Sequence, residues 1–586
     1  MAWPNYHFID LDKAEKRLRR ETINRYALYG ELSSLIPIVI LLVYRLVKHA
    51  SSRASGAGYA AVPSSPVLKQ RRNSGLGSVR TRVRSLSWWL CEDVVLFGTV
   101  LGQRDQWLVG FAWTAWLLLL CVLEAGEDYL HLTKRIGSVA ISQWPLQYLL
   151  AAKSLNPLAY LLQTSHEQVN RWHRVMARIT STLISLHAAL YLAFFIQRDR
   201  LDRLAEPVVI AGMVSFQALN LLITTALRPV RNYSYRLFFV IHAVVGLAIP
   251  VLLLVHAHHS RIFVIQVLII FILNAVSRKL NSVTASATLQ SIPGTDLIKI
   301  AARVPQEKLN RFRAIPGSHV FLSLPAAARG DDHLIFEFLL NPFTVASVDE
   351  ETDTLTLVAR RRNGPMTTTL SRMATAAATA SSARPSNRSP SADEQDDNKI
   401  PLSLEGPYGP APRLARLCAD YDRILLVAGG IGATFTLPLY QAILAEQPAA
   451  NVEMIWSVRR AGDATWAVTG PRARALLVDP RIHLYVTGDA AAVEEDASMA
   501  AGGDEELGQE LRALFRGRGG RWTAQNNRRR PDLGRIVDDV FRMGQEERVA
   551  VLVCGPQEMV REVRRAVGTW VARGRGVWFH GEGFGY

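Results

Sequence analysis

The chain has 586 residues, enough for two or three domains that each bury a core. Its mean hydropathy of +0.10 averages an apolar first half and a more polar second half. A formal net charge of +16 would suit a nucleic-acid-binding protein, but neither zinc-finger spacing nor an RNA-binding aromatic motif accompanies the basic residues, so we expect no nucleic-acid partner. Basic loops beside membrane spans account for the charge.

Seven apolar segments are candidates for membrane spans, each near the ~20 residues that a bilayer core requires. They are residues 32–49, 107–124, 137–153, 172–195, 207–227, 236–257 and 262–277. The first starts behind a charged segment, so we expect a retained anchor and not a cleaved signal. Basic residues gather in the loop 50–86 and after the last span, so the positive-inside rule places the second half of the chain in the cytoplasm.

The fourth and sixth segments each carry two histidines fourteen residues apart: His173 with His187, and His242 with His256. Fourteen residues make almost four helical turns, so both histidines of a segment share one face, about 21 Å apart. Both helices run in the same direction, which lets His173 face His242 near the inner leaflet and His187 face His256 near the outer one. Two stacked bis-histidine sites are what two haems require, and filled axial positions favour electron transfer.

The alternative interpretation is that each histidine packs between helices and hydrogen-bonds a neighbour. Ionisable residues at this depth in a membrane are costly and usually functional. Two pairs with equal spacing on parallel helices therefore favour haem over packing.

The second half contains two compositionally biased insertions, about 374–398 and 489–507, that we interpret as disordered loops. Outside them, the first part is rich in short strands, and in the last part apolar strands alternate with helical stretches. The expected domains are an N-terminal anchor span with a basic cytoplasmic loop (1–106), a transmembrane haem domain (107–280), an FAD-binding β-barrel (285–410) and an NADPH-binding α/β domain (421–586).

The segment NPFTVAS, residues 341–347, follows an apolar strand and suits a flavin. Phe343 would stack on the ring, and Thr344 and Ser347 would hydrogen-bond its polar edge; an ordinary turn is the alternative. The segments 359–370 and 404–409 supply arginine, threonine and glycine for the diphosphate and a close backbone approach. The residues that we assign to FAD are Asn341, Pro342, Phe343, Thr344, Ser347, Arg360, Gly364, Thr367 and Gly406.

The segment YDRILLVAGGIGATFTLPLY, residues 421–440, joins a buried strand to a helix through Gly429, Gly430 and Gly432. Glycines let the backbone approach a pyrophosphate, and the helix N-terminus stabilises its charge. The GGxGxT pattern differs from GxGxxG, so the sheet need not have the Rossmann topology. Arg459 and Arg460 end the next strand, where arginines pair with a 2′-phosphate and favour NADPH over NADH; a solvated basic strand end is the alternative.

Another buried strand ends in Cys554, Gly555 and Pro556, where a nicotinamide would approach. We interpret Cys554 as a small packing residue, because no histidine base lies near it in sequence. Further along, Glu582 and Phe584 are candidate contacts of the nicotinamide or the flavin. We expect no catalytic group beyond these and the electron carriers.

Together these residues resemble fungal ferric reductases, within the ferric reductase and NADPH oxidase superfamily. The resemblance covers about residues 105–586 and depends on the histidine pairs and on the motifs PFT, EGPYG, LLVAGGIGATF, IWSVRR and CGP. It implies an α-helical membrane haem domain fused to a ferredoxin-reductase-like module, in which an antiparallel FAD barrel precedes an NADPH domain with a parallel sheet. It also implies that the four histidines ligate two b-type haems, that Phe343 and Thr344 hold the flavin, and that NADPH is held by Gly429, Gly430, Gly432, Thr434, Cys554 and Gly555.

The chain departs from the family pattern at two places. The family has histidine before Pro-Phe-Thr, where this chain has Asn341, which hydrogen-bonds but does not titrate near neutral pH. The family C-terminus reads Glu-Ser-Phe-x-Trp, whereas Glu582 to Tyr586 keeps the acid and an aromatic and loses the hydroxyl. Neither change removes an electron carrier, so we expect activity.

The resemblance implies an NADPH-dependent ferric-chelate reductase that passes electrons through FAD and two haems to extracellular ferric iron, ferric chelates or cupric ion. We expect it in the plasma membrane or a vacuolar membrane, beside an iron or copper uptake system. One open alternative is an NADPH oxidase that reduces dioxygen to superoxide. Another is a nucleotide-sensing membrane receptor or transporter without redox activity.

Overall fold

The protein is described by a computed structural model. Its described residues are 6–54, 75–162, 164–292, 294–328, 340–382, 399–409, 414, 417–468, 479–488, 530–544 and 547–583. The chain forms two compact units. We name Met1–Tyr59 with Trp89–Asn281 the membrane unit, and Ala60–Trp88 with Ser282–Tyr586 the nucleotide unit.

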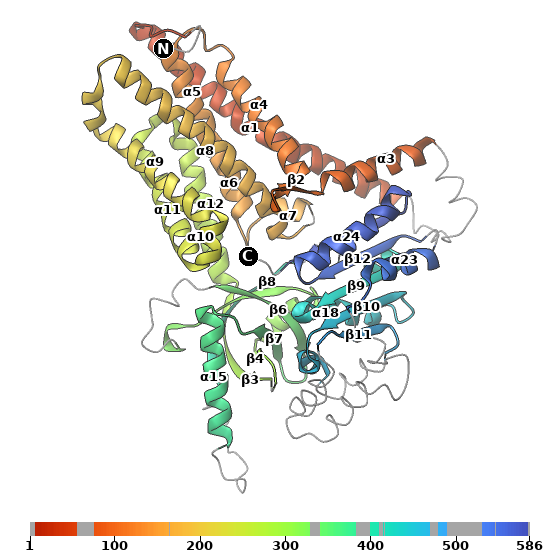
Figure 1. Cartoon of the computed structure of the whole chain (residues 1–586). Coiled ribbons are helices and arrows are strands. Elements are labelled where there is room, and N and C mark those ends of the chain that lie inside the picture. The colour runs from red at the N-terminus through yellow and green to blue at the C-terminus, as the bar shows by residue number, and fades with distance from the viewer. Residues whose placement is uncertain are drawn as a thin grey trace. The chain divides into compact units, whose positions relative to one another are not determined.

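The membrane unit is a bundle of helices, coloured red to yellow-green in Figure 1. A short hairpin of β1 (Asp93–Leu96) and β2 (Thr99–Gln103) leads into its second long helix. The helices are α1 (Lys13–Ala54), α4 (Arg104–Val122), α5 (Tyr129–Ser142), α6 (Trp144–Ala151), α7 (Pro157–Leu162), α8 (His166–Gln197), α9 (Pro207–Ala226), α10 (Arg228–Tyr233), α11 (Tyr235–His256) and α12 (Arg261–Leu280).

Six helices in the described part of the chain are long and apolar enough to cross a membrane: α1, α4, α8, α9, α11 and α12, the last including the short turn before it. Our expectation of a seventh continuous span over 137–153 was wrong, because α5 and α6 divide that segment. Pro145, near the start of α6, has no amide hydrogen for the preceding turn, and its ring would clash there. Asp128, just before α5, pairs with Arg19 of α1 at 2.9 Å, and the amide of Lys153, just after α6, donates to Asn274 of α12 at 3.1 Å.

Side-chain caps fix where the central helices begin. The Ser165 hydroxyl accepts the amide of Gln168 at the start of α8, and Ser234 accepts the amide of Leu237 at the start of α11. Each cap satisfies a backbone donor that the first helical turn leaves free. The caps set the register of the two helices that carry the four histidines.

The first part of the nucleotide unit is a closed, antiparallel six-stranded barrel with the strand order β3-β4-β7-β6-β5-β8. Its strands are β3 (Ser282–Ser291), β4 (Leu297–Arg303), β5 (His319–Ser323), β6 (Asn341–Asp349), β7 (Thr354–Arg360) and β8 (Ile400–Tyr408), with α13 (Gln306–Arg313) between β4 and β5. Alternate residues point inward, so a row such as Ile298, Ile300 and Ala302 fills the interior.

The second part is a five-stranded parallel sheet with the order β11-β10-β9-β12-β13. Its elements are β9 (Arg423–Gly429), α18 (Ala433–Glu446), β10 (Val452–Val458), β11 (Ile482–Val486), α23 (Leu533–Met543), β12 (Val549–Cys554), α24 (Gln557–Ala572) and β13 (Val577–Glu582). The central strands are apolar on both faces because helices cover both. The predicted fold class is confirmed: a helical membrane domain followed by an antiparallel barrel and a parallel α/β sheet.

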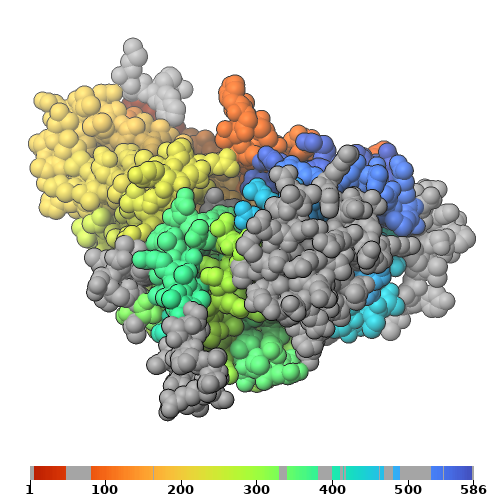
Figure 2. Space-filling view, turned by 60° about the horizontal axis from the view of Figure 1, so that its bottom comes forward, coloured from red at the N-terminus to blue at the C-terminus, as the bar shows by residue number. Residues whose placement is uncertain are grey.

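The insertion expected at 374–398 is in part a helix, which corrects our interpretation. Helix α15 (Pro365–Ser382) stands on the barrel surface, green in Figure 2. Met366, Leu370 and Ala374 recur every four residues and are buried against the barrel core, which gives this alanine-rich segment a reason to fold. The rest of that insertion, the insertion at 489–507 and Phe584 lie outside the described residues.

Candidate functional site

The first histidine pair lies between α8 and α11. The ring centroids of His173 and His242 are 6.2 Å apart. An imidazole nitrogen binds a metal at about 2 Å, so two imidazoles on opposite sides of one ion have centroids roughly 6 Å apart. The separation of this pair therefore fits a single iron between the rings.

The second pair, His187 and His256, lies fourteen residues further along the same two helices. Each ring fits into a space left by a glycine of a neighbouring helix. A Cβ on Gly137 of α5 would come within 2.6 Å of the His187 ring, and one on Gly212 of α9 would overlap the His256 ring. Sequence reasoning missed both glycines, because nothing local links them to a histidine.

Backbone carbonyls orient three of the four imidazoles. Nδ1 of His173 donates to the carbonyl of Gln147 at 2.9 Å. Nδ1 of His187 donates to the carbonyl of Thr133, and Nδ1 of His256 to that of Val208, both at 2.7 Å. A carbonyl only accepts, so the proton is on Nδ1 and the lone pair is on Nε2, the arrangement of a metal-binding histidine.

His242 differs from the other three. Its Nδ1 is buried without a hydrogen-bond partner in the described part of the chain. Phe238, one turn earlier on α11, packs against the ring with centroids 5.1 Å apart. Apart from that orphaned nitrogen, the donor set fits two iron centres with two nitrogen ligands each.

Six of the nine predicted flavin residues lie on β6 or β8: Asn341, Pro342, Phe343, Thr344, Ser347 and Gly406. In register, Thr344 of β6 faces His319 of β5, which in turn faces Tyr408 of β8. The Tyr408 hydroxyl donates to Glu405 at 2.6 Å, and both side chains are buried. Sequence reasoning missed His319, because only strand pairing brings it to this position.

Three predicted flavin residues have the following surroundings in the structure. Phe343 packs partly against the barrel core. Ser347 is exposed beyond a bulge, roughly 10 Å along the strand from Thr344. The Thr367 hydroxyl is used within its own turn, where it donates to the carbonyl of Arg362.

Gly406 and Arg360 have geometry that suits a nucleotide. Gly406 has φ +154, and a Cβ there would lie 3.1 Å from the carbonyl oxygen of His319, so only glycine fits without strain. Arg360 forms an ion pair with Asp463 at 3.3 Å and lies beside Gly430. Its Nε is buried with no hydrogen-bond partner among the described residues, a donor that a phosphate oxygen would satisfy.

The predicted NADPH residues are largely brought together at the carboxyl ends of β9 and β12. A Cβ on Gly429 would lie 2.7 Å from the Pro556 ring, and one on Gly555 would lie 3.1 Å from the Gly429 nitrogen. The two loops therefore touch through their backbones. Thr434, at the start of α18, is buried and donates its hydroxyl to the carbonyl of Ile431. This edge of a parallel sheet is where α/β proteins bind nucleotides.

Cys554 is fully buried at the same edge, opposite Glu582 in the register of β12 and β13. Burial raises the pKa of its thiol well above the usual value, and the nearby Glu582 charge adds to the rise. The thiol stays protonated and is not a nucleophile, which agrees with a packing role. The Glu582 carboxylate lies 2.9 Å from Nε2 of His580.

Arg459 and Arg460 follow β10, the strand beside β9, and both side chains are exposed. Arg460 donates to the carbonyl of Gly294 at 3.2 Å. Both arginines lie at the carboxyl end of the parallel strands, where α/β proteins bind nucleotides, and an anionic ligand can reach them.

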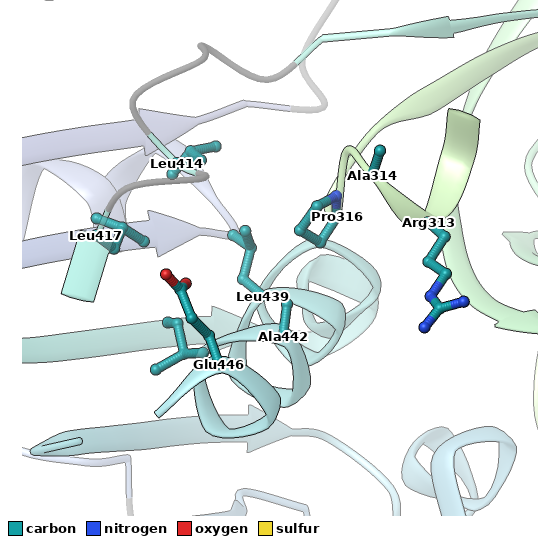
Figure 3. Close-up of a pocket in the computed structure, with 9 residues that line it drawn as sticks. Arg313, Ala314, Pro316, Leu414, Leu417, Leu439, Ala442 and Glu446 are labelled. Carbon is teal, nitrogen blue, oxygen red and sulfur yellow. The ribbon is translucent and has the colours of Figure 1, made fainter. Parts of the chain in front are cut away.

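A pocket of about 160 Å³ lies elsewhere in the nucleotide unit, between the loop after α13 and the C-terminal half of α18 (Figure 3). Leu439 and Ile443 are among its apolar lining residues, and Arg313 and Glu446 are its charged ones. None of the predicted cofactor residues lines it.

Family models of known proteins match three regions of this chain. The family model for a ferric reductase like transmembrane component matches residues 136–254, that for an FAD-binding domain residues 281–412, and that for a ferric reductase NAD binding domain residues 421–568. Together these ranges take up about two thirds of the chain.

Curated fungal proteins match the same arrangement along most of their length. The chain is 21% identical to ferric/cupric reductase transmembrane component 2 of Schizosaccharomyces pombe, over 76% of this chain and 80% of that protein. It is 22% identical to ferric reductase transmembrane component 1 of the same yeast (74% and 76%), and 24% identical to "Probable metalloreductase AIM14" of Meyerozyma guilliermondii (83% and 88%). The chain belongs to the ferric reductase family.

As a ferric reductase, it is a transmembrane oxidoreductase with an FAD-binding and an NAD-binding domain after the membrane domain. The resemblance stated from the motifs is therefore confirmed. The histidine pairs lie on helices of the matched membrane region, except that His256 falls two residues beyond its end.

Proposed function

We propose that this ferric reductase carries electrons from cytosolic NADPH through FAD and two b-type haems to ferric iron, a ferric chelate or cupric ion outside the plasma membrane. One observation carries the proposal. Two histidine pairs occur at two levels of one pair of helices, and three of the four imidazoles have Nδ1 fixed by a carbonyl. A packing histidine would hydrogen-bond through either ring nitrogen, whereas all three of these use Nδ1 and keep the lone pair on Nε2.

Bound flavin and haem would supply the redox chemistry: they would accept two electrons as a hydride and pass them on to the metal one at a time. The chain supplies positioning. Gln147, Thr133 and Val208 hold imidazole protons at Nδ1. Gly137 and Gly212 let the outer imidazoles approach helices α5 and α9.

In the nucleotide unit, the residues would bind and orient NADPH and FAD. The backbone of Gly429–Gly432 and the N-terminus of α18 would hold the NADPH pyrophosphate. Arg360, with its orphaned Nε, would bind a phosphate oxygen, and Arg459 and Arg460 would distinguish NADPH from NADH. Cys554, kept as a neutral thiol, would close one side of the nicotinamide site without reacting.

The test is a visible spectrum of membranes that carry the full chain, before and after NADPH and then ferric citrate. We expect haem bands that NADPH reduces and ferric citrate reoxidises. His187→Ala should lose about half of the haem absorbance and nearly all ferric reduction. His166→Ala, a histidine of the same helix outside both pairs, is the matched control and should behave as wild type.

The outcomes discriminate between functions. Membranes without haem would overturn the proposal. Haem that reoxidises with air but not with chelate, with superoxide that a dismutase intercepts, would assign the chain to oxygen reduction instead. NADH that serves as well as NADPH would refute the cofactor preference alone.

A further inference from the structure

Helix α3 (Gly75–Leu90) follows the first span, far from the nucleotide-binding sequences, yet residues up to Trp88 belong to the nucleotide unit. None of the three matched family ranges includes it. Its next residue, Trp89, belongs to the membrane unit and lies under the guanidinium of Arg104 there. The two adjacent indoles are therefore held by different units.

Two side chains of the nucleotide unit contact the Trp88 indole. The guanidinium carbon of Arg564, on α24, lies 4.3 Å from the ring centroid, and the same arginine donates to the Trp88 carbonyl at 3.2 Å. Phe579 of β13 meets the ring edge-on, with centroids 5.8 Å apart. Cation–π and edge-to-face contacts in a partly buried cluster are each worth a measurable share of stability.

A glycine on α24 provides a third neighbour of the ring. A Cβ on Gly568 would lie 2.9 Å from Nε1 of Trp88, too close for a rigid ring to tolerate. Glycine is a poor helix former, so its presence inside α24 is explained by the space that the indole needs. Thr81 and Arg84 of α3 lie near the turn after α24, because a Cβ added to Gly574 or Gly576 would come within 3.4–3.6 Å of them. These are ordinary contact distances, so of the three glycines only Gly568 is required by the space that α3 occupies.

The strand that Trp88 contacts needs support. In the described part of the sheet, β13 is the last strand, so only β12 pairs with it. The opposite face of β13 carries His580 and Glu582, and Glu582 lies opposite Cys554 at the nucleotide-binding edge. A side-chain anchor at Phe579 fixes an edge strand that backbone hydrogen bonds hold on one side alone.

We infer that residues 75–88 complete the NAD-binding domain, and that Trp88 is a positioning residue for β13 and so for Glu582. The inference rests on the proposed function for the identity of the hydride donor. It adds a role for a segment that the family's matched regions leave out. Trp88 touches neither cofactor site directly; it acts through Phe579.

The experiment measures flavin reduction by NADPH in the solubilised full-length protein, in a stopped-flow single turnover. Trp88→Ala should lower the limiting rate roughly ten- to a hundredfold, as a displacement of about 1 Å would, with the NADPH concentration at half-maximal rate changed less than twofold. Trp88→Phe keeps an aromatic ring over Arg564 and should restore most of the rate. Trp89→Ala is the matched control and should reduce flavin as wild type does.

Gly568→Ala separates positioning from general damage. Alanine is the better helix former, so the substitution should harm the protein only through the indole. We expect it to slow flavin reduction in the wild-type background and to have no added effect beside Trp88→Ala. An equal loss in both backgrounds would overturn the inference.

Digestion by trypsin gives a readout that is independent of any activity. Released α3 should be cut faster in Trp88→Ala than in Trp89→Ala or in Arg565→Ala, an exposed arginine next to Arg564. Wild-type digestion together with wild-type flavin reduction in Trp88→Ala would refute the role of Trp88. If flavin reduction depended on Trp88 but the wild-type protein reduced no metal, the proposed function would be refuted and the role of Trp88 would stand.

Discussion

Gly432 and Cys554 touch through their backbones, so that a methyl group on Gly432 would overlap the carbonyl oxygen of Cys554. The glycine-rich turn after β9 and the Cys-Gly-Pro turn after β12 are therefore one packed structure. The third glycine of GGIG is required by strand packing, and the first by its contact with Pro556.

Gly432→Ala should abolish NADPH oxidation, because the added Cβ would force the two turns apart. Overpacking of this kind typically lowers the free energy of unfolding by about 1–3 kcal/mol or more. NADPH-dependent dye reduction and the yield of folded protein measure the effect. Gly534→Ala, whose Cβ would meet only ordinary contacts, is the control. A Gly432→Ala protein with normal turnover would contradict the packing account.

Gly212→Ala should displace the His256 ring, and Gly137→Ala the His187 ring, so each should lower the haem content by about one haem in two. The ratio of haem to protein, from the reduced-minus-oxidised spectrum, checks this. Gly246→Ala is the matched control, because a Cβ on this α11 glycine meets nothing within 4 Å. Equal haem content in all three variants would show that these glycines do not serve the outer pair.

Arg459→Ala combined with Arg460→Ala should reverse the choice of coenzyme. Charge-assisted hydrogen bonds contribute about 1.5–3 kcal/mol, so the KM for NADPH should rise roughly tenfold or more, and the KM for NADH should change little. Steady-state dye reduction with both coenzymes provides the measurement. An equal loss with NADPH and NADH would mean that the arginines support the fold and not the 2′-phosphate.

Cys554 gives a pH dependence of stability. Burial raises the pKa of its thiol in the folded protein, whereas the thiol of an unfolded cysteine has a pKa of about 8.5. Stability is thus complete below about pH 8.5 and decreases above it, by up to ~1.4 kcal/mol per pH unit, as the unfolded thiol loses its proton. Urea unfolding between pH 8 and 10 tests this, and Cys554→Ala should flatten the slope. Alkylation of Cys554 in the folded protein at pH 8 would contradict the buried, neutral thiol.

Some of the site followed from sequence because its information is periodic. The fourteen-residue spacing placed His173 near His242, and strand-glycine-helix order placed the turn of Gly429 at a sheet edge. Met366, Leu370 and Ala374 also have a helical spacing, of four residues. We interpreted the alanine-rich composition from residue 374 onward as disorder and missed the helix. Its stability comes from the barrel surface on which it packs, which local propensity does not report.

Other parts could not be predicted, because they depend on contacts between distant segments. Gly137 and Gly212 lie on helices without the four histidines, and His319 reaches Thr344 only through strand pairing. The span expected over 137–153 failed for a local reason that was visible, since Pro145 breaks it. Sequence thus predicted the carriers of chemistry better than the residues that make room for them.

The distance along the chain between Trp88 and Arg564, 476 residues, has a consequence for biosynthesis. At roughly 5–20 residues per second, the ribosome makes Trp88 about half a minute to a minute and a half before its partners on α24 and β13. During that interval α3 has no surface to dock on, and its indole stays available to chaperones. Docking of this early helix is therefore a late event of assembly, and it marks a chain that has been translated through to its last strand.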